Sequence, residues 1–363
     1  MNLQKVLVLF LCAVLLMQST LAFETDQYNL PPQPLSDIGT EVSEYTESVV
    51  RQSVAKVNAE IEVRQKCVDN PVKDCDKPDK NLKRLKYLRS DEAVAREVCK
   101  ILGSGIPPFT SSGSWMESHK FRTDFARYKI SYRKSIFLTL PISYIGLAST
   151  VNMYDAQFGT DKIAHLFQDG YEYFKKYQEA VNKGLTPAQA TEKAVNWGKK
   201  TERTIFGTWI SGVYSNADLF SNYIGLKFYQ GLTQELKIGN TTRPATLRLK
   251  DGVWIINENF DMPNMLLKPF ISNHLNEALN PSVFTQMFGL RGYVRHVLKK
   301  QACSEWLHQY PNISPAELDK ETTKLQLWNG EDYGFTDSKN FVTIANTCFS
   351  EEYLSKTAET SEN

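Results

Sequence analysis

Acidic, basic and amide side chains recur at helical spacing between residues 161 and 225. Asp161, Lys162 and His165 lie within five consecutive residues, and Asp161 and His165, four residues apart, share one face of a helix. A carboxylate and an imidazole on one face can act as a general acid and base or bind a metal ion. The same spacing is also typical of a solvated helix surface, and for His165 taken alone we favour that interpretation.

Glu202 interrupts an apolar stripe of the next predicted helix. The other residues of this stripe are Gly198, Ile205, Phe206 and Trp209. A carboxylate in such a band needs a cation, hydrogen-bond donors or a proton, because burying it unpaired costs several kcal/mol. The alternative is an ion pair with Lys199, three residues earlier, on the helix surface.

A third predicted helix is apolar nearly all round, which favours burial. Its main polar interruption is a narrow stripe made of Asp218, Ser221, Asn222 and Gly225. Polar residues confined to one stripe of a buried helix should face one another or a solvated cleft. Gly225 would allow another backbone to approach closely.

The order Asp161-Lys162-Ile163-Ala164-His165, then Glu202, then Asp218 to Gly225 resembles a known motif. The motif is the DKxxH…E…DxxxNxxG pattern of VanZ-like bacterial membrane proteins and small YfiM-type lipoproteins, and the resemblance covers about residues 161–231. It implies a helical, envelope-associated protein. The functional residues that it implies are Asp161, Lys162, His165, Glu202, Asp218, Asn222 and Gly225. VanZ-like proteins cross the membrane several times, whereas this chain has one weakly apolar candidate segment beyond its leader.

A fainter combination is His274 and Glu277, three residues apart in a helix predicted over residues 264–279. Both side chains could reach one metal ion or one proton path. The alternative that we favour is a hydrogen-bonded pair on the helix surface.

Two functions compete for the residues around His165. In the preferred hypothesis Glu202, Asp218 and Asn222 fix the packing of three helices with His165 as a hydrogen-bond partner, and the protein has a structural or binding role. In the alternative it is a hydrolase of an envelope lipid or cell-wall component, with His165 as general acid or base and Glu202 as its partner. A variant of the alternative places Mg, Mn or Zn among Asp161, His165, Glu202 and Asp218.

Composition and the leader indicate the compartment. The chain has 363 residues and a formal net charge of +1, which argues against nucleic acid as a partner. Residues 1–22 have the pattern of a signal peptide: Lys5, a continuous apolar run over 6–17, and small residues at Thr20 and Ala22. Cleavage near Ala22 would place the mature protein in the periplasm or outside the cell, with an envelope component or a membrane surface as its partner.

Five cysteines follow the leader, and in an oxidising compartment most of them should pair. Cys67 with Cys75 is the easiest local pair, and Cys303 with Cys348 could tie the C-terminal segment down, but the spacing of the cysteines does not fix which of them pair. Because five is odd, one thiol is left over or pairs between chains.

The elements that position these residues form a mainly α fold, a multi-helix bundle with one small β-hairpin at about 246–256. We divide the chain into a signal peptide (1–22), an arm with a long amphipathic helix and a charged connector (23–105), a helical core (106–240), and a hairpin with further helices and a polar tail (241–363). Predicted helices cover 36–64, 91–102, 160–182, 187–214, 216–236, 264–279, 282–309 and 314–327.

Two segments raise the question of membrane contact. Residues 135–154 carry no charge, and we interpret them as a buried helix or helix-turn, with membrane contact as the alternative. The basic segment 80–89 is typical of a solvated face, although a basic helix with leucines can also sit on an anionic membrane. A membrane-docked protein that uses both segments is therefore a third hypothesis.

Overall fold

The computed structural model describes residues 25–70, 75, 77–106, 109–137, 147–206, 212–285, 289–336 and 340–355. Helices dominate these residues, which confirms the prediction of a mainly α fold. The predicted signal peptide, the middle of the uncharged segment (138–146) and the tail beyond residue 355 lie outside the described residues. In the described ranges no helix combines the length and the apolar character needed to span a bilayer.

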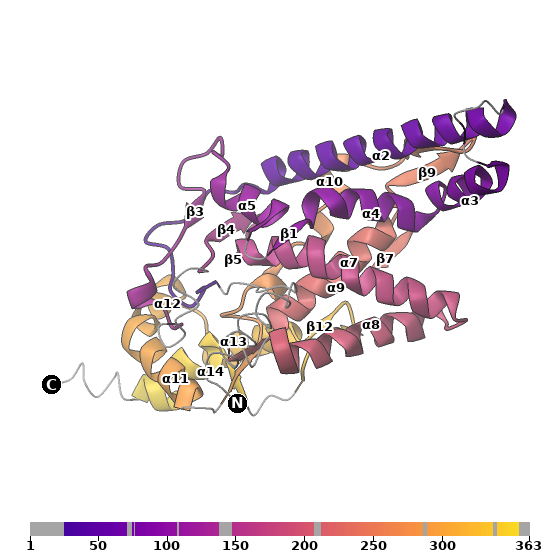
Figure 1. The fold of residues 1–363 in the computed structure, drawn as a ribbon. Coiled ribbons are helices and arrows are strands. Elements are labelled where there is room, and N and C mark those ends of the chain that lie inside the picture. The colour runs from indigo at the N-terminus through magenta and orange to yellow at the C-terminus, as the bar shows by residue number, and fades with distance from the viewer. Residues whose placement is uncertain are drawn as a thin grey trace, which may run out of the picture.

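Long helices form the frame of the molecule (Figure 1). Helix α2 (Gly39–Asp69) lies along one edge and packs on α3 (Pro78–Leu88) and α4 (Asp91–Leu102). Below them α7 (Thr160–Asn182) packs against both α9 (Asn216–Gly231) and α8 (Pro187–Thr201). The bounds of α4 and α7 agree with the prediction, whereas α2 starts and ends a few residues later than predicted.

Shorter helices complete the chain. They are α5 (Ser111–Ser118), α10 (Met262–Met265), α11 (Leu290–Gln301), α12 (Cys303–Gln309), α13 (Pro315–Lys324) and α14 (Ile344–Cys348). Single turns of 3₁₀-helix occur at Tyr132–Lys134, Lys268–Phe270 and Asn273–Leu275. Helix α13 begins at a capping box, in which Ser314 and Glu317 satisfy each other's backbone N–H groups.

The predicted hairpin is present as β9 (Leu247–Lys250) paired with β10 (Val253–Ile256). Asp251 and Gly252 at its turn have φ of 51° and 79°, the left-handed values that an Asp-Gly hairpin turn requires.

The expectation of a single hairpin was wrong. Other short antiparallel sheets join β1 (Gly105–Ile106) to β2 (Phe109–Thr110), β7 (Leu236–Ile238) to β8 (Thr241–Arg243), β12 (Leu327–Trp328) to β13 (Glu331–Asp332), β3 (Arg127–Tyr128) to β4 (Thr150–Met153) and β5 (Ala156–Gly159), and β6 (Val213–Ser215) to β11 (Ser282–Phe284) and β14 (Phe341–Val342). These strands have two to four residues, too few for an alternating pattern to be visible in the sequence.

Several predicted helices are shorter than expected. The helix over 187–214 ends at Thr201 and continues as a π-helical turn, Glu202–Phe206, before β6. The helix over 216–236 ends at Gly231. The helix over 314–327 starts at Pro315 and ends at Lys324.

The helix predicted over 264–279 is wrong, and the one predicted over 282–309 is confirmed only from Leu290 onward, as α11 and α12. The first segment holds only the end of α10 and two 3₁₀ turns, because Pro269 has no N–H to donate and the Asn276 side chain accepts from the N–H of Ala278. The second begins as strand β11 and becomes helical only at Leu290.

Buried apolar side chains form two clusters. The larger contains the inner faces of α2, α4, α7, α8 and α9. The smaller contains α11, α12 and α14 together with Tyr28, whose backbone carbonyl accepts a 2.7 Å hydrogen bond from Trp306 Nε1. The Cys303–Cys348 and Cys67–Cys75 disulfides are both formed, and Cys99 is the remaining free thiol among the described residues.

The N-terminal arm begins inside the protein. Residues 25–29 have no helix or strand, yet all five are buried. Thr25 hydrogen-bonds to Asp161 of α7 and Tyr28 to the carbonyl of Val342, so the segment contacts both the long helices and the C-terminal cluster.

Candidate functional site

Helix α7 places three of the predicted residues in the interior. Its first turns carry Asp161, Lys162 and His165, which are 7%, 0% and 7% exposed. The surface interpretation of His165 was therefore wrong. The apolar face of α7 packs into the larger cluster, and the polar face is covered by α9 and by the segments around residues 25 and 277.

Lys162 is the centre of the site. Its Nζ lies 2.6 Å from Asp161 Oδ2 and 2.5 Å from Asp218 Oδ1, and it also contacts Glu277 Oε1. The three carboxylates come from α7, α9 and the segment after the Asn273–Leu275 turn. A fully buried ammonium needs such partners, because its desolvation costs several kcal/mol.

His165 joins the same group of charges from the next turn of α7. Its Nδ1 lies 2.9 Å from Asp169 Oδ2 and 3.2 Å from Asn222 Oδ1, and its Nε2 lies 3.6 Å from Asp218 Oδ1. Burial favours the neutral ring, but Asp218 and Asp169 outweigh burial and raise the pKa of His165 to about 10. The two carboxylates therefore favour the protonated form of the ring.

Glu202 lies where α8 changes into a π-helical turn, a feature frequent at functional sites. It is 6% exposed, and its Oε1 accepts a 3.2 Å hydrogen bond from the backbone N–H of Ser215. The alternative pair with Lys199 does not form, because Lys199 Nζ lies 2.9 Å from Asp332 instead. Burial, together with the negative charge of Asp218, raises the pKa of Glu202 to about 8.

Ser215 connects the start of α9 to the rest of the site. As the N-cap of α9 it accepts a hydrogen bond from the N–H of Asp218, and its Oγ donates a 2.9 Å hydrogen bond to Glu277 Oε1. Burial of Asp218 alone would raise its pKa, but Lys162 and His165 outweigh burial and lower it. Burial raises the pKa of Glu277 to about 7.

Gly225 does not contact the charged groups but sets the distance between their helices. A Cβ at this position would lie 2.1 Å from the carbonyl oxygen of Leu166 and 2.6 Å from the Cα of Gly170. The close approach anticipated at Gly225 is therefore present. It allows Ser221 Oγ to donate a hydrogen bond to the Lys162 carbonyl.

His274 and Glu277 do not share a site. Glu277 is 1% exposed and contacts Lys162, whereas His274 stacks on Phe220 and bonds through Nε2 to the carbonyl of Leu327 at 3.0 Å. Burial lowers the pKa of His274, which fits a neutral ring. The predicted hydrogen-bonded pair of His274 and Glu277 on a helix surface was therefore wrong.

Sequence reasoning missed the contribution of the N-terminal segment. Thr25 Oγ1 donates a 2.6 Å hydrogen bond to Asp161 Oδ1, and Gln27 Oε1 accepts from the N–H of Glu277. Neither residue lies in a periodic pattern, so no local signal identifies them. We use the term ionic network for Asp161, Lys162, His165, Asp169, Glu202, Asp218 and Glu277.

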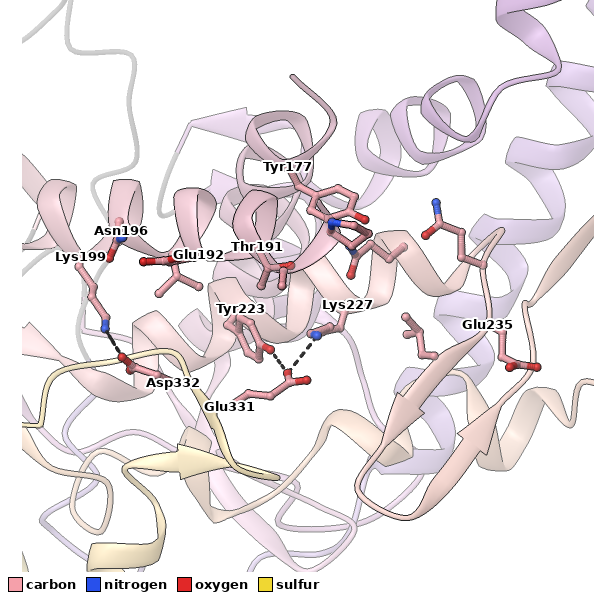
Figure 2. Close-up of a pocket in the computed structure, with 16 residues that line it drawn as sticks. Tyr177, Thr191, Glu192, Asn196, Lys199, Tyr223, Lys227, Glu235, Glu331 and Asp332 are labelled. Atoms are coloured by element: carbon pink, nitrogen blue, oxygen red, sulfur yellow. Dashed lines mark hydrogen bonds and ion pairs between the residues drawn. The ribbon is translucent and has the colours of Figure 1, made fainter. Parts of the chain in front are cut away.

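A separate cavity of about 530 Å³ is lined by residues of α8, α9 and β13 (Figure 2). Its wall includes Tyr177 of α7, Lys199 of α8, Tyr223 and Lys227 of α9, and Glu331. Lys227 Nζ lies 2.9 Å from Glu331 Oε2, and burial lowers the pKa of this lysine to about 8. The cavity offers polar and aromatic groups to a ligand without exposing the ionic network.

Comparison of the chain with protein-family models, with curated proteins and with solved structures finds no match.

Proposed function

We propose that the protein is an exported helical protein of the cell envelope whose ionic network has a structural or binding role. The observation that carries the proposal is the contact of Lys162 with three carboxylates from three separate parts of the chain. Such a network specifies one packing of α7, α9 and the segment around residue 277, because any other packing leaves buried charges without partners. The resemblance to VanZ-like and YfiM-type proteins belongs to the same proposal.

The binding role has support in the cavity beside α9. Its Lys227–Glu331 pair and the side chains of Gln230 and Gln234 can hydrogen-bond to a polar ligand. An envelope component rich in hydroxyl or amide groups fits this lining, and a membrane surface is the other partner class of the proposal.

Export has support in the two disulfides, which are typical of oxidising compartments. N-terminal sequencing of the protein recovered from the periplasm or the culture medium should begin at Phe23. Recovery of the whole product in the cytosol, with Met1 retained, would contradict export.

The structural role is tested with Lys162→Met, which keeps the length of the side chain but removes its charge. We expect a loss of about 3–5 kcal/mol in the free energy of unfolding, because three buried carboxylates lose their cation. The control is Lys199→Met, whose partner Asp332 is 56% exposed and whose loss should cost about 1 kcal/mol or less. Equal losses in urea denaturation of the two variants would contradict the role of Lys162.

A hydrolase acting on an envelope lipid or a cell-wall component is the second candidate, and Glu202 favours it. A carboxyl group with a pKa of about 8 is protonated at neutral pH and can act as a general acid. His165, with a pKa of about 10, would supply positive charge rather than act as a base. Hydrolysis of envelope extracts by the wild type that is lost in a folded Glu202→Gln variant would support this candidate over the structural one.

A further inference from the structure

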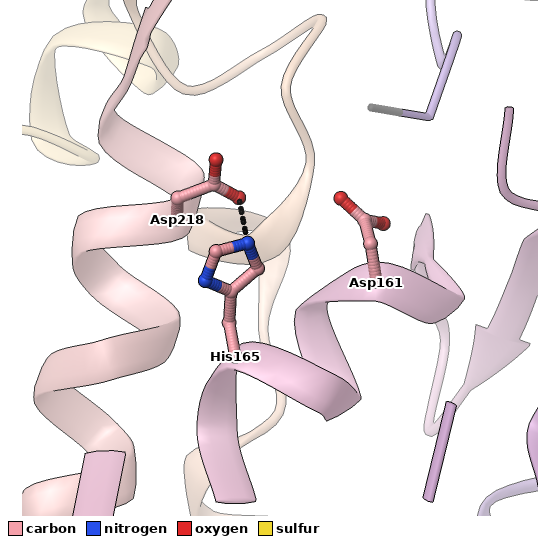
Figure 3. A group of neighbouring side chains, drawn as sticks. All are labelled: Asp161, His165 and Asp218. Atoms are coloured by element: carbon pink, nitrogen blue, oxygen red, sulfur yellow. Dashed lines mark ion pairs between the residues drawn. The ribbon is translucent and has the colours of Figure 1, made fainter. Parts of the chain in front are cut away.

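Asp161, His165 and Asp218 point toward one another in the interior (Figure 3). Each offers one ligand atom, and these atoms all lie within 4.8 Å of one another. Asp161 and His165 are one turn apart on α7, and Asp218 is in the first turn of α9. Two ligands at i and i+4 on a helix and a third from a neighbouring element are a recurrent way to hold a metal ion.

The spacing fits a first-row divalent ion. Ligand atoms about 2.0–2.2 Å from one ion lie roughly 3.0–3.5 Å from each other. His165 Nε2 and Asp218 Oδ1 are 3.6 Å apart. This pair is already close to the spacing of metal ligands, and the remaining ligand atoms, which lie within 4.8 Å, must move closer together to bind an ion.

The two nitrogens of His165 have different surroundings. Nδ1 lies 2.9 Å from Asp169, whereas Nε2, on the side of Asp161 and Asp218, has no hydrogen-bond partner within the described part of the chain. A metal-bound histidine usually donates one N–H to a carboxylate and directs its other nitrogen at the ion, which at His165 would replace the proton on Nε2. Thr25 orients the Asp161 carboxylate in the same way.

The charge of the surroundings points to a cation as well. Among the described residues the ionic network holds five carboxyl groups but only two basic side chains, Lys162 and His165. Glu277 Oε2, buried beside Lys162, has no hydrogen-bond partner among the described residues. Lys162 already shows that these carboxylates hold a positive charge.

We infer that Asp161, His165 and Asp218 bind one divalent metal ion, Zn²⁺ or Mn²⁺. The inference rests on the proposed function, because it names the ligand of the same ionic network. One imidazole nitrogen with two carboxylate oxygens favours these ions over Ca²⁺ and Mg²⁺, which prefer oxygen ligands alone.

The test uses mature, tag-free protein that is treated with EDTA, dialysed, and titrated with ZnCl₂, MnCl₂ or MgCl₂ in a calorimeter. We expect one Zn²⁺ or Mn²⁺ per chain, a higher melting temperature with the ion, and weaker binding of Mg²⁺. The inference would be overturned if the folded wild type bound neither Zn²⁺ nor Mn²⁺ stoichiometrically. It would also be overturned if Mg²⁺ bound as tightly as Zn²⁺ and Mn²⁺.

Substitutions at the proposed ligands, and at the residue that orients His165, test where the ion binds. Asp161→Asn and Asp218→Asn should abolish binding of the ion. Asp169→Asn should weaken binding 10- to 100-fold, because Asp169 orients His165 without being a ligand itself. The matched control is Glu41→Gln, which removes the 2.7 Å partner of His119 and should leave the affinity unchanged. Wild-type affinity in folded Asp169→Asn and Asp161→Asn would show that the ion binds elsewhere.

The metal site and the structural role of the ionic network can be contradicted independently of each other. If Lys162→Met is strongly destabilised while the wild type binds no metal, the network stands and the metal site falls. If the wild type binds one metal ion and Lys162→Met is as stable as Lys199→Met, the metal site stands and the structural role falls.

Discussion

At the scale of residues, the interior of this protein holds more acid than base. Lys162 and His165 face five carboxyl groups, and the pKa values of Glu202 and Glu277 are raised because burial disfavours a charged carboxylate and Asp218 adds negative charge. The protein must therefore take up protons, or a cation, as it folds. This makes its stability depend on pH in a way that single substitutions can reveal.

Glu202→Gln tests this dependence. The pKa of Glu202 is about 8 in the folded protein against an ordinary value of 4.5, so folding is favoured at low pH and this advantage is lost as pH rises from about 4.5 to 8. Glutamine stays neutral, and relative to the wild type the variant should gain on the order of 1 kcal/mol per pH unit across that window. Urea denaturation at pH 5 and pH 8 measures the difference, and parallel curves would contradict a buried, protonated Glu202.

The charged residues could be predicted from the sequence to a useful extent. Asp161 was predicted from its helical spacing to His165, and Glu202 and Asp218 from polar residues within apolar helices, and the structure brings them together. The partnership of Glu277 with Lys162 spans 115 residues and the hydrogen bond from Thr25 to Asp161 spans 136, so neither has a local signature.

At the scale of elements, the contact between α7 and α9 positions the site. Gly170 and Gly225 let the two backbones meet, and the polar stripe of each helix then faces the other. The predicted bounds of α7 were correct because its apolar period is continuous. The predicted bounds around residues 202–215 were wrong because β6 is stabilised by pairing with β11, about 70 residues later, rather than by its own sequence.

Gly225→Ala should therefore destabilise the protein by about 1–3 kcal/mol or more, because the added Cβ meets the Leu166 carbonyl. Gly292→Ala is the matched control in helix α11, where a Cβ meets nothing within 4 Å. That change should be neutral or stabilising by up to about 1 kcal/mol. Thermal denaturation of the two variants and the wild type measures the difference in stability. A Gly225→Ala variant as stable as the wild type would argue against close packing of α7 and α9.

At the scale of the whole molecule, two long-range links hold the C-terminal part to the helical frame. They are the β6–β11–β14 sheet and the buried segment at residues 25–29, while the Cys303–Cys348 disulfide joins α12 to α14 within the C-terminal part. The spacing of the cysteines left their pairing open, and the structure forms the two candidate pairs. The burial of residues 25–29 could not be predicted, because a Pro-rich polar sequence is typical of an exposed arm.

The disulfides should contribute unequally to stability. Replacing Cys303 and Cys348 by alanine opens a loop of 45 residues and should cost about 4 kcal/mol, whereas opening the 8-residue loop of Cys67 and Cys75 should cost about 2.5 kcal/mol. Guanidinium unfolding of the two double variants tests the order. A larger loss at Cys67 and Cys75 would show that the C-terminal part is held by other contacts.

The most direct test of the central claim is a double-mutant cycle between Lys162 and Glu277, because their contact joins α7 to a distant part of the chain in the interior. Lys162→Met, Glu277→Gln and the double variant are compared with the wild type by urea denaturation at one pH. A buried ion pair predicts a coupling free energy of about 1–3 kcal/mol, with the double variant more stable than the sum of the two losses implies. Additive losses within about 0.5 kcal/mol would mean that the two side chains do not meet, and would contradict the ionic network.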